Sequence, residues 1–287
     1  MYRFLVEPYQ SGFMARALLE VALLGVIGAA VGVHVLLRRL TFLTEALQHT
    51  VFPGIAIAFA LETSLLLGAL VAAAVTVVVL VGLTRDDRVN TDAALAVMTV
   101  AFFALGVAVV SHRSGYAADL NQLLFGRILG VGVTEVVETA AIGLLLVATL
   151  TALHKELVLV AFDRVQASAL GYRVDVLDVI LNAAVALAVV AAVRAVGSVL
   201  VVGFVVTPAA TARLVTKSVA GAVVVGAAIA MTAGWIALSV SYDASVHHDV
   251  SLAPGATVVV GFEVVFVVVA IVAASHRLVV RRRAAVA

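Results

Sequence analysis

Nine apolar stretches, each about as long as one membrane crossing, follow one another along this 287-residue chain. A helix needs about 20 apolar residues to cross the hydrocarbon core of a bilayer. The stretches are 17–37, 41–61, 64–83, 92–111, 133–153, 174–193, 195–212, 218–240 and 255–275. They are too long for barrel strands and lack the alternation of such strands. They therefore predict a single all-α membrane domain over residues 1–287.

The composition agrees with this prediction and excludes an ordinary soluble fold. Hydrophobic residues make up 64% of the chain and charged residues only 12%, whereas soluble domains are nearer half apolar and a quarter charged. No cationic segment or small-residue cleavage site flanks the first stretch, so we expect it to be retained as a span. Cysteine is absent, which excludes disulfides and thiolate metal sites.

Basic residues are distributed unevenly between the predicted loops, and this bias predicts the orientation. With the N-terminus outside, 13 of the 18 Lys and Arg residues fall on the inner side. The outer side receives only Arg3, Arg16, Arg113, Arg127 and Arg194. The pattern favours an odd number of spans, with a cytoplasmic C-terminus and a basic cytoplasmic tail at 276–287.

Glu45 and His49 stand within the second apolar stretch, where a carboxylate costs about 2.5–3.5 kcal/mol on insertion scales. They are four residues apart, so both side chains share one face of a helix. A carboxylate and an imidazole together suit divalent Mn, Zn or Fe. Pro53 and Gly54 follow, and interrupted transporter helices expose backbone groups at binding sites. The alternative is a Glu at the helix start near the membrane surface beside a core histidine.

Three further places carry polar groups that are weaker candidates. Glu263 lies in the last stretch and either lines a pathway or pairs with another helix. His247, His248 and Asp249 form a small cluster suited to metal in the expected outer loop 241–253, where a solvated loop is the commoner role. Pro208 is expected to kink the inner end of the seventh stretch.

The inner segment 155–173 is expected to form a short helix at the cytoplasmic face. Asp163 can cap that helix, with Gln166 three residues later as in a capping box, and Gly171 provides its stop. The alternative is an ordinary turn between spans. The chain has no GxxxxGK[S/T] phosphate loop, so an ATP-driven process would need a second polypeptide. No nucleophile, base and orienting acid occur at reactive spacing, so we predict no enzyme activity.

Together these segments resemble the permease subunit of bacterial ATP-binding-cassette (ABC) importers for zinc, manganese and iron. The resemblance covers nearly the whole chain and rests on five ordered matches. They are RRLTFLTEALQHTVFPGIAIA (38–58), SHRSGYAADLNQLLFGRILG (111–130), FDRVQASALG (162–171), VGSVLVVGFVVTPAATARLV (196–215) and PGATVVV (254–260).

This resemblance implies a bundle related to type II ABC importer permeases in a bacterial plasma membrane. It implies a homodimer, two cytoplasmic ATP-binding subunits that use the ATP, and an extracytoplasmic metal-binding protein, with no permanent cofactor and no nucleic acid. It implies a metal-path role for Glu45 and His49. It also implies that the segment containing Phe162, Asp163, Ala167 and Gly171 couples ATP hydrolysis to the permease.

The sequence departs from the family pattern at three positions. Glu45 stands where the family usually has Asp, Gln48 where it has Ser, and Arg127 where it has an acidic residue. The extra methylene of Glu45 leaves the transported metal open. Three other readings remain: a permease for a siderophore or cobalamin, an ion-gradient-driven carrier, and a non-transporting membrane anchor. An intramembrane ligand pair argues against the siderophore or cobalamin permease and against the membrane anchor.

Overall fold

The computed structural model describes residues 2–83, 90–111, 124, 126–248, 250 and 252–284, and this part of the chain is helical without strands. A short α1 (Tyr2–Leu5) and η1 (Glu7–Gln10) precede the main helices. The main helices are α2 (Gly12–Arg38), α3 (Thr41–Ala60), α4 (Leu65–Leu83), α5 (Thr91–Val110), α7 (Val133–Ala152), α8 (His154–Phe162), α9 (Arg164–Ala169), α10 (Val174–Val196), α11 (Val201–Val215), α12 (Val219–His247) and α13 (Pro254–Ala284). A 3₁₀ turn, η2 (Ile128–Gly130), precedes α7.

Six of these helices are long and apolar enough to cross a membrane by themselves: α2, α5, α7, α10, α12 and α13. Two shorter apolar segments, Leu65–Leu80 and Val201–Val215, lie in the expected third and seventh spans. Helix α3, which covers the expected second span, continues through Pro53 without a break. The chain is therefore an all-helical multi-pass membrane protein.

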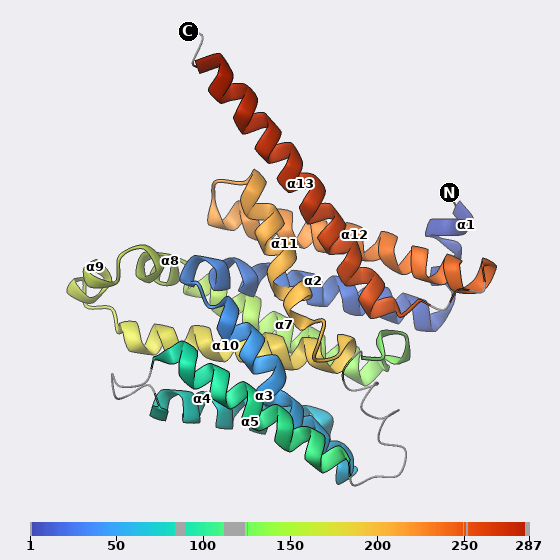
Figure 1. The fold of residues 1–287 in the computed structure, drawn as a ribbon, viewed down its shortest axis with the longest axis horizontal. Coiled ribbons are helices and arrows are strands. Elements are labelled where there is room, and N and C mark those ends of the chain that lie inside the picture. The colour runs from blue at the N-terminus through green and yellow to red at the C-terminus, as the bar shows by residue number, and fades with distance from the viewer. Residues whose placement is uncertain are drawn as a thin grey trace.

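Helix α2 lies at the centre of the bundle and packs against α12, α11 and α7 (Figure 1). Helices α3, α4 and α5 form a second group, in which α3 packs closely on both of the others. Helix α10 packs against α2 on one side and against α3 and α4 on the other. The two groups are thus joined mainly through α10.

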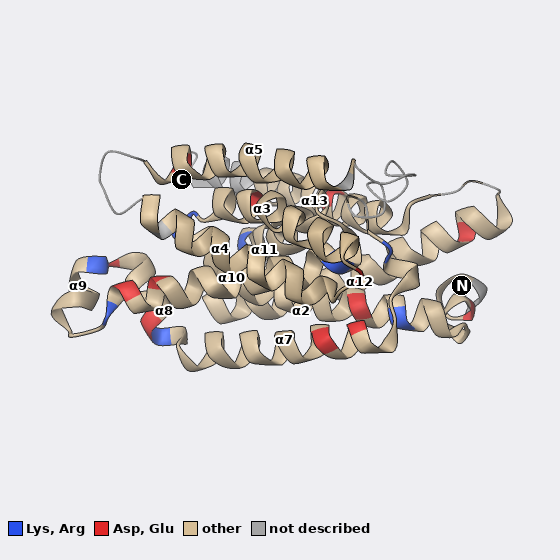
Figure 2. Ribbon diagram, turned by 90° about the horizontal axis from the view of Figure 1, so that it is seen from below, with Lys and Arg blue, Asp and Glu red and all other residues tan. Residues whose placement is uncertain are grey.

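Charged residues gather toward two ends of the molecule, and the middle is largely uncharged (Figure 2). Helix α9 marks one end and the N-terminus the other, while the C-terminal end of α13 lies toward the α9 end (Figure 1). This distribution fits a slab of hydrocarbon between two aqueous faces, because unpaired charge is expensive inside a bilayer.

Gly28 and Gly32 set the close crossing of α2 and α11. A side-chain carbon on Gly28 would lie 3.1 Å from the carbonyl carbon of Phe204, and one on Gly32 would overlap the carbonyl oxygen of Val205. Four-residue spacing puts both glycines on one face, as in other tightly packed membrane helices. Pro208 lies four residues after Phe204 and has no N–H to donate to its carbonyl, so Gly28 meets backbone that the helix leaves unpaired.

The structure corrects the expected boundaries of the seventh and eighth spans and shows a longer last helix. The seventh stretch, expected from residue 195, begins as a helix only at Val201, because Gly197 takes a left-handed φ of 80° and ends α10. Helix α12 continues to His247, so residues 241–247 are helical and are not part of a loop. Helix α13 continues to Ala284, so most of the expected tail 276–287 is helical, and the part of α13 suited to a membrane span, Pro254–His276, agrees with the expected 255–275.

Candidate functional site

The candidate site begins with Glu45 and His49 on successive turns of α3. Their side chains approach each other, with 3.6 Å between Glu45 Oε1 and His49 Nε2. This separation fits an ion pair but exceeds a normal hydrogen bond. The side chain of Glu45 is 44% exposed and that of His49 is 23% exposed. The pair therefore faces an opening and is not sealed within the helix bundle.

The imidazole of His49 is held by its neighbours while one nitrogen stays free. The ring meets Phe103 of α5 edge to face, with centroids 5.4 Å apart. Gln48 Nε2 lies 3.4 Å from His49 Nε2. Nδ1 of His49 and Oε1 of Gln48 are buried, and no described residue forms a hydrogen bond with either atom. Buried polar atoms without partners are costly, so these atoms mark a place where a further polar group would be stabilised.

Pro53 adds a backbone oxygen to this set. A proline cannot donate the hydrogen bond that the carbonyl four residues earlier would accept. That carbonyl belongs to His49. One turn of α3 therefore offers an imidazole and a carbonyl oxygen that lacks its usual helical donor, with a carboxylate one turn before. These are the ligand types that suit manganese and zinc.

Gly54 lets α4 approach this turn of α3. A side-chain carbon on Gly54 would overlap the carbonyl oxygen of Gly68 in α4, and one on Gly68 would overlap that of Gly54. On the α5 side, Gly106 lies against Phe52 and Pro53. The backbone around Pro53 is therefore fixed by close contacts, which position the ligand pair.

Within the described residues, no group of three or more His, Asp or Glu side chains could hold a metal ion. Glu45 and His49 are thus two candidate ligands, too few to complete a metal site by themselves. They share a face of α3 with Phe42, which is 41% exposed. A complete coordination shell needs ligands from water or from another chain facing this surface.

Glu263 is engaged elsewhere. Its Oε1 accepts a hydrogen bond of 2.8 Å from Thr207 Oγ1, which joins α13 to α11 one residue before Pro208. The sequence left two roles open for this carboxylate, lining a pathway or pairing with another helix, and the structure shows the pairing. Pro208 lies inside α11, and the helix continues past it to Val215.

His247 and His248 pair with a residue that the sequence prediction omitted. Asp243 Oδ1 lies 3.1 Å from His247 Nδ1, and Asp243 Oδ2 lies 3.8 Å from His248 Nε2. Both histidine side chains are more than 60% exposed. Asp249, the third member of the expected cluster, lies outside the described residues.

The segment 155–173 folds into α8 and the six-residue α9. Asp163 caps α9 by accepting a 2.8 Å hydrogen bond from the backbone N–H of Gln166. Gly171 follows the helix with a φ of 87°, and the N–H of Tyr172 bonds back to the carbonyl of Ala167, as in a Schellman stop. Ala167 is fully buried, whereas Phe162 is 73% exposed. The segment is thus anchored on one side and presents an apolar surface on the other.

Asp178 connects α9 to the transmembrane helices. Its carboxylate accepts from Arg164 of α9 with one oxygen and from Arg38 of α2 with the other. The Arg38 side chain is only 11% exposed and that of Arg164 is 54% exposed. One carboxylate on α10 therefore ties the short helix to the central span.

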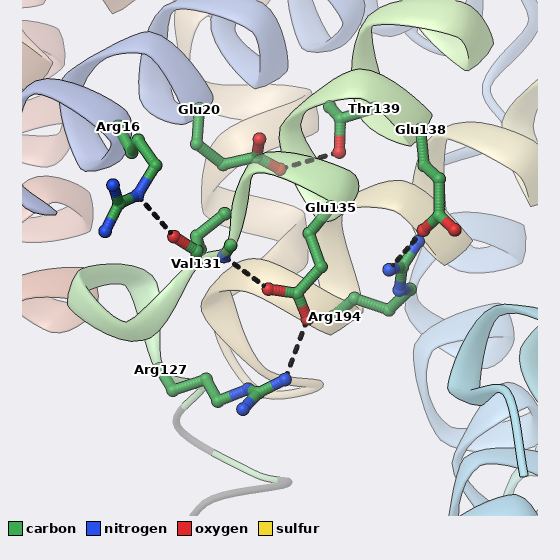
Figure 3. Close-up of polar contacts among 9 residues, drawn as sticks. Arg16, Glu20, Arg127, Val131, Glu135, Glu138, Thr139 and Arg194 are labelled. Atoms are coloured by element: carbon green, nitrogen blue, oxygen red, sulfur yellow. Dashed lines mark hydrogen bonds and ion pairs between the residues drawn. The ribbon is translucent and has the colours of Figure 1, made fainter.

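A network of charged residues at the opposite end escaped the sequence prediction (Figure 3). Glu20 of α2 is 1% exposed and accepts a 2.7 Å hydrogen bond from Thr139 of α7. Arg194 at the end of α10 pairs with Glu138 of α7 at 2.6 Å. The sequence did contain a signal for this network, because Glu20 is a carboxylate within the first apolar stretch.

Arg127 and Glu135 extend this network. Arg127 Nη2 donates to Glu135 Oε1 at 2.7 Å, and the second oxygen of Glu135 accepts from the N–H of Gly132. The N–H of Arg127 also bonds to the carbonyl of Ala195 in α10. The network clamps the start of α7 to the end of α10, and its cations disfavour a metal ion there.

The fold and site together define a membrane permease: long apolar helices, a paired carboxylate and imidazole one turn before a proline inside the helix, and an exposed short helix at one face. The chain belongs to the ABC 3 transport family, which it matches over residues 10–273. The expected relationship to metal-type ABC permeases of bacterial plasma membranes is confirmed.

Among its relatives is the manganese transport system membrane protein MntC of Halalkalibacterium halodurans, 33% identical over 71% of this chain and 70% of that protein. The manganese import system permease protein ScaB of Streptococcus gordonii is 28% identical over 94% of this chain and 95% of that protein. The structure of PsaBC from Streptococcus pneumoniae in complex with Fab superposes with a TM-score of 0.83 at 26% identity, covering 94% of this chain and 95% of that chain.

Proposed function

We propose that this chain is the permease subunit of an ATP-driven importer that moves a divalent transition metal ion, with Mn²⁺ as the foremost substrate, into the cytoplasm. The carrying observation is the pairing of Glu45 and His49 on a partly exposed face of α3, beside a carbonyl freed by Pro53. Exposing this carboxylate and imidazole to lipid would cost free energy, whereas a divalent cation passing beside them would stabilise them. The manganese relatives support the choice of metal.

The proposal includes a second copy of this chain. Two protein side chains leave a divalent ion short of ligands, and the exposed face of α3 gives a second copy a surface on which to complete the path. In this arrangement nine spans place the N-terminus outside and the C-terminus in the cytoplasm. The positions of the two termini at opposite ends of the bundle support an odd number of crossings (Figure 1).

Two cytoplasmic ATPases would dock on α9 and the exposed side chain of Phe162. ATP binding and hydrolysis would shift the permease between outward- and inward-open states by favouring one of them. The ion pairs of Asp178 with Arg164 and Arg38 give that movement a route into α10 and α2. An extracytoplasmic metal-binding protein would deliver the ion at the opposite end.

The test is ATP-dependent uptake of Mn²⁺ into liposomes containing the complete transporter. His49→Ala removes the imidazole without adding bulk, so uptake falls at least about tenfold while membrane insertion is unchanged. His276→Ala, an exposed histidine of α13, is the matched control and keeps normal uptake. Normal uptake by the His49 variant would exclude this site, and uptake without any ATPase subunit would favour an ion-gradient-driven carrier.

A further inference from the structure

A groove of about 600 Å³ lies where α7 ends and α8 begins. Its lining includes Val26 and Ala30 of α2, Leu150 of α7, and Val223 of α12. Helices α7 and α12 pack on α2, the central span. The volume is within the range of small-molecule sites, and most of the lining is apolar.

One end of this groove is polar. His34 of α2 and His154, Lys155 and Glu156 of α8 all line it. His34 is 3% exposed. Within the part of the chain that the structure describes, its Nδ1 has no hydrogen-bond partner, and neither has the buried Oε2 of Glu156. Lys155 is exposed and makes no ion pair with another described residue. A cation and a carboxylate therefore both line this end of the groove, and neither has an ion-pair partner among the described residues.

This polar end favours a ligand that carries both charges. A metal ion is disfavoured, because Lys155 repels it and no three metal-ligating side chains converge among the described residues. A purely anionic ligand would satisfy Lys155 but would face the carboxylate of Glu156. A phosphate beside a primary ammonium group satisfies both, since the ammonium donates charge-assisted hydrogen bonds to the carboxylate.

The apolar part of the groove matches one leaflet of a bilayer. Val26 and His34 are eight residues apart on α2, which corresponds to about 12 Å at 1.5 Å per residue. Half of the hydrocarbon core is about 15 Å thick. An acyl chain could lie along the groove with its headgroup at the polar end, where α7 leaves the membrane.

We propose that this groove binds one phospholipid whose headgroup carries a primary amine. Its phosphate lies at Lys155 and His154, its ammonium group at Glu156, and an acyl chain runs over Ala30 between α7 and α12. The assignment of the groove to the cytoplasmic leaflet rests on the proposed function, which orients the chain with α9 in the cytoplasm. No other part of the inference depends on that function. Binding itself requires neither metal nor ATP.

Native mass spectrometry of the purified transporter tests this site, with phosphatidylethanolamine, phosphatidylcholine and phosphatidylglycerol offered in turn. Phosphatidylcholine keeps the charges but has no N–H donors, so we expect phosphatidylethanolamine to be retained about tenfold better. Glu156→Gln removes this preference. Asp175→Asn, an exposed carboxylate at the same end, is the control and preserves it.

Two more variants separate the headgroup from the acyl chain. Lys155→Ala weakens retention of phosphatidylethanolamine and phosphatidylcholine alike, because both carry the phosphate. Val224→Phe fills the rim of the groove, where Val224 is 69% exposed, and reduces retention of every phospholipid. Soluble glycerophosphoethanolamine, which has no acyl chain, does not compete if the ligand is a lipid.

Equal retention of the three phospholipids, or the same preference in Glu156→Gln as in the control, would overturn the assignment. Exclusion of lipid by a second copy of the chain seated over the groove would overturn it as well. His49→Ala retains the lipid preference, so failure of the metal site and failure of this site are distinguishable.

Discussion

Asp178 of α10 accepts a hydrogen bond from Arg164 of α9, and its other carboxylate oxygen accepts from Arg38 of α2. Arg164→Ala breaks only the link to α9. Because Arg164 is 54% exposed, its loss lowers stability by less than about 1 kcal/mol. We nevertheless expect more ATP to be hydrolysed per metal ion moved, measured as the ratio of phosphate released to Mn²⁺ taken up in liposomes.

Asp178→Asn removes both ion pairs and leaves the largely buried Arg38 without its anion. A buried charge left uncompensated in this way costs about 3–5 kcal/mol, so the melting temperature falls and the coupling between ATP hydrolysis and metal uptake weakens. Arg173→Ala, an exposed arginine just before α10, is the matched control. An unchanged ratio in both variants would remove Asp178 from the coupling route.

Pro53→Ala returns a backbone donor to the His49 carbonyl. Proline in a helix interior costs about 3 kcal/mol, so we expect the variant to gain stability and lose uptake together. Thermal melting in detergent and Mn²⁺ uptake in liposomes measure the two effects. Pro208→Ala in α11 is the comparison, and it lies away from the ligand pair. A Pro53 variant that gains stability at full uptake would exclude the carbonyl from the path.

Glu45→Gln removes the carboxylate and keeps its size. Oxygen ligands matter more to Mn²⁺, whereas imidazole suits Zn²⁺, so Mn²⁺ uptake falls more than Zn²⁺ uptake. Glu45→Asp retains a carboxylate and recovers uptake with an altered preference between the two ions. Competition of Mn²⁺ against Zn²⁺ in the same vesicles measures this preference. Equal losses for both ions in Glu45→Gln would show that the carboxylate does not distinguish them.

Gly32→Val forces a branched side chain into the backbone of α11 at Val205. Overpacking of a tight contact costs about 1–3 kcal/mol, and we expect a clear fall in the melting temperature. Gly82→Ala is the control, because a side-chain carbon there meets nothing within 4 Å. That change is neutral or stabilising by about 0.5–1 kcal/mol. Equal melting temperatures for the two variants would contradict the close crossing of α2 and α11.

Hydropathy predicted where the chain is helical and apolar, because desolvation of the backbone leaves few alternatives in a membrane. The four-residue spacing of Glu45 and His49 predicted that they share one face, since residues at this spacing do so on any α-helix. The Asp163 cap and the Gly171 stop could be predicted from the sequence, because each depends on residues only a few positions away along the chain.

Other features depend on contacts that no local pattern contains. The turn at Gly197 was missed because apolar residues flank it on both sides, and its left-handed backbone is held by Gly126 and Leu124 from a distant segment. Arg194 was expected at an outer helix end, but its ion pair could not be predicted, because its partner Glu138 lies on another helix. His247 was assigned to a loop, because residues 241–247 are polar enough to end an apolar run while still helical.

The division of the bundle has a mechanical consequence. Glu45 and His49 belong to the α3–α5 group, which meets the rest of the chain chiefly along α10, and α10 also carries Asp178. On the proposed function, a force on α9 would reach α10, the helix against which α3 and α4 pack. A shift of α3, α4 and α5 along α10 would then move Glu45 and His49 without breaking hydrogen bonds within any helix.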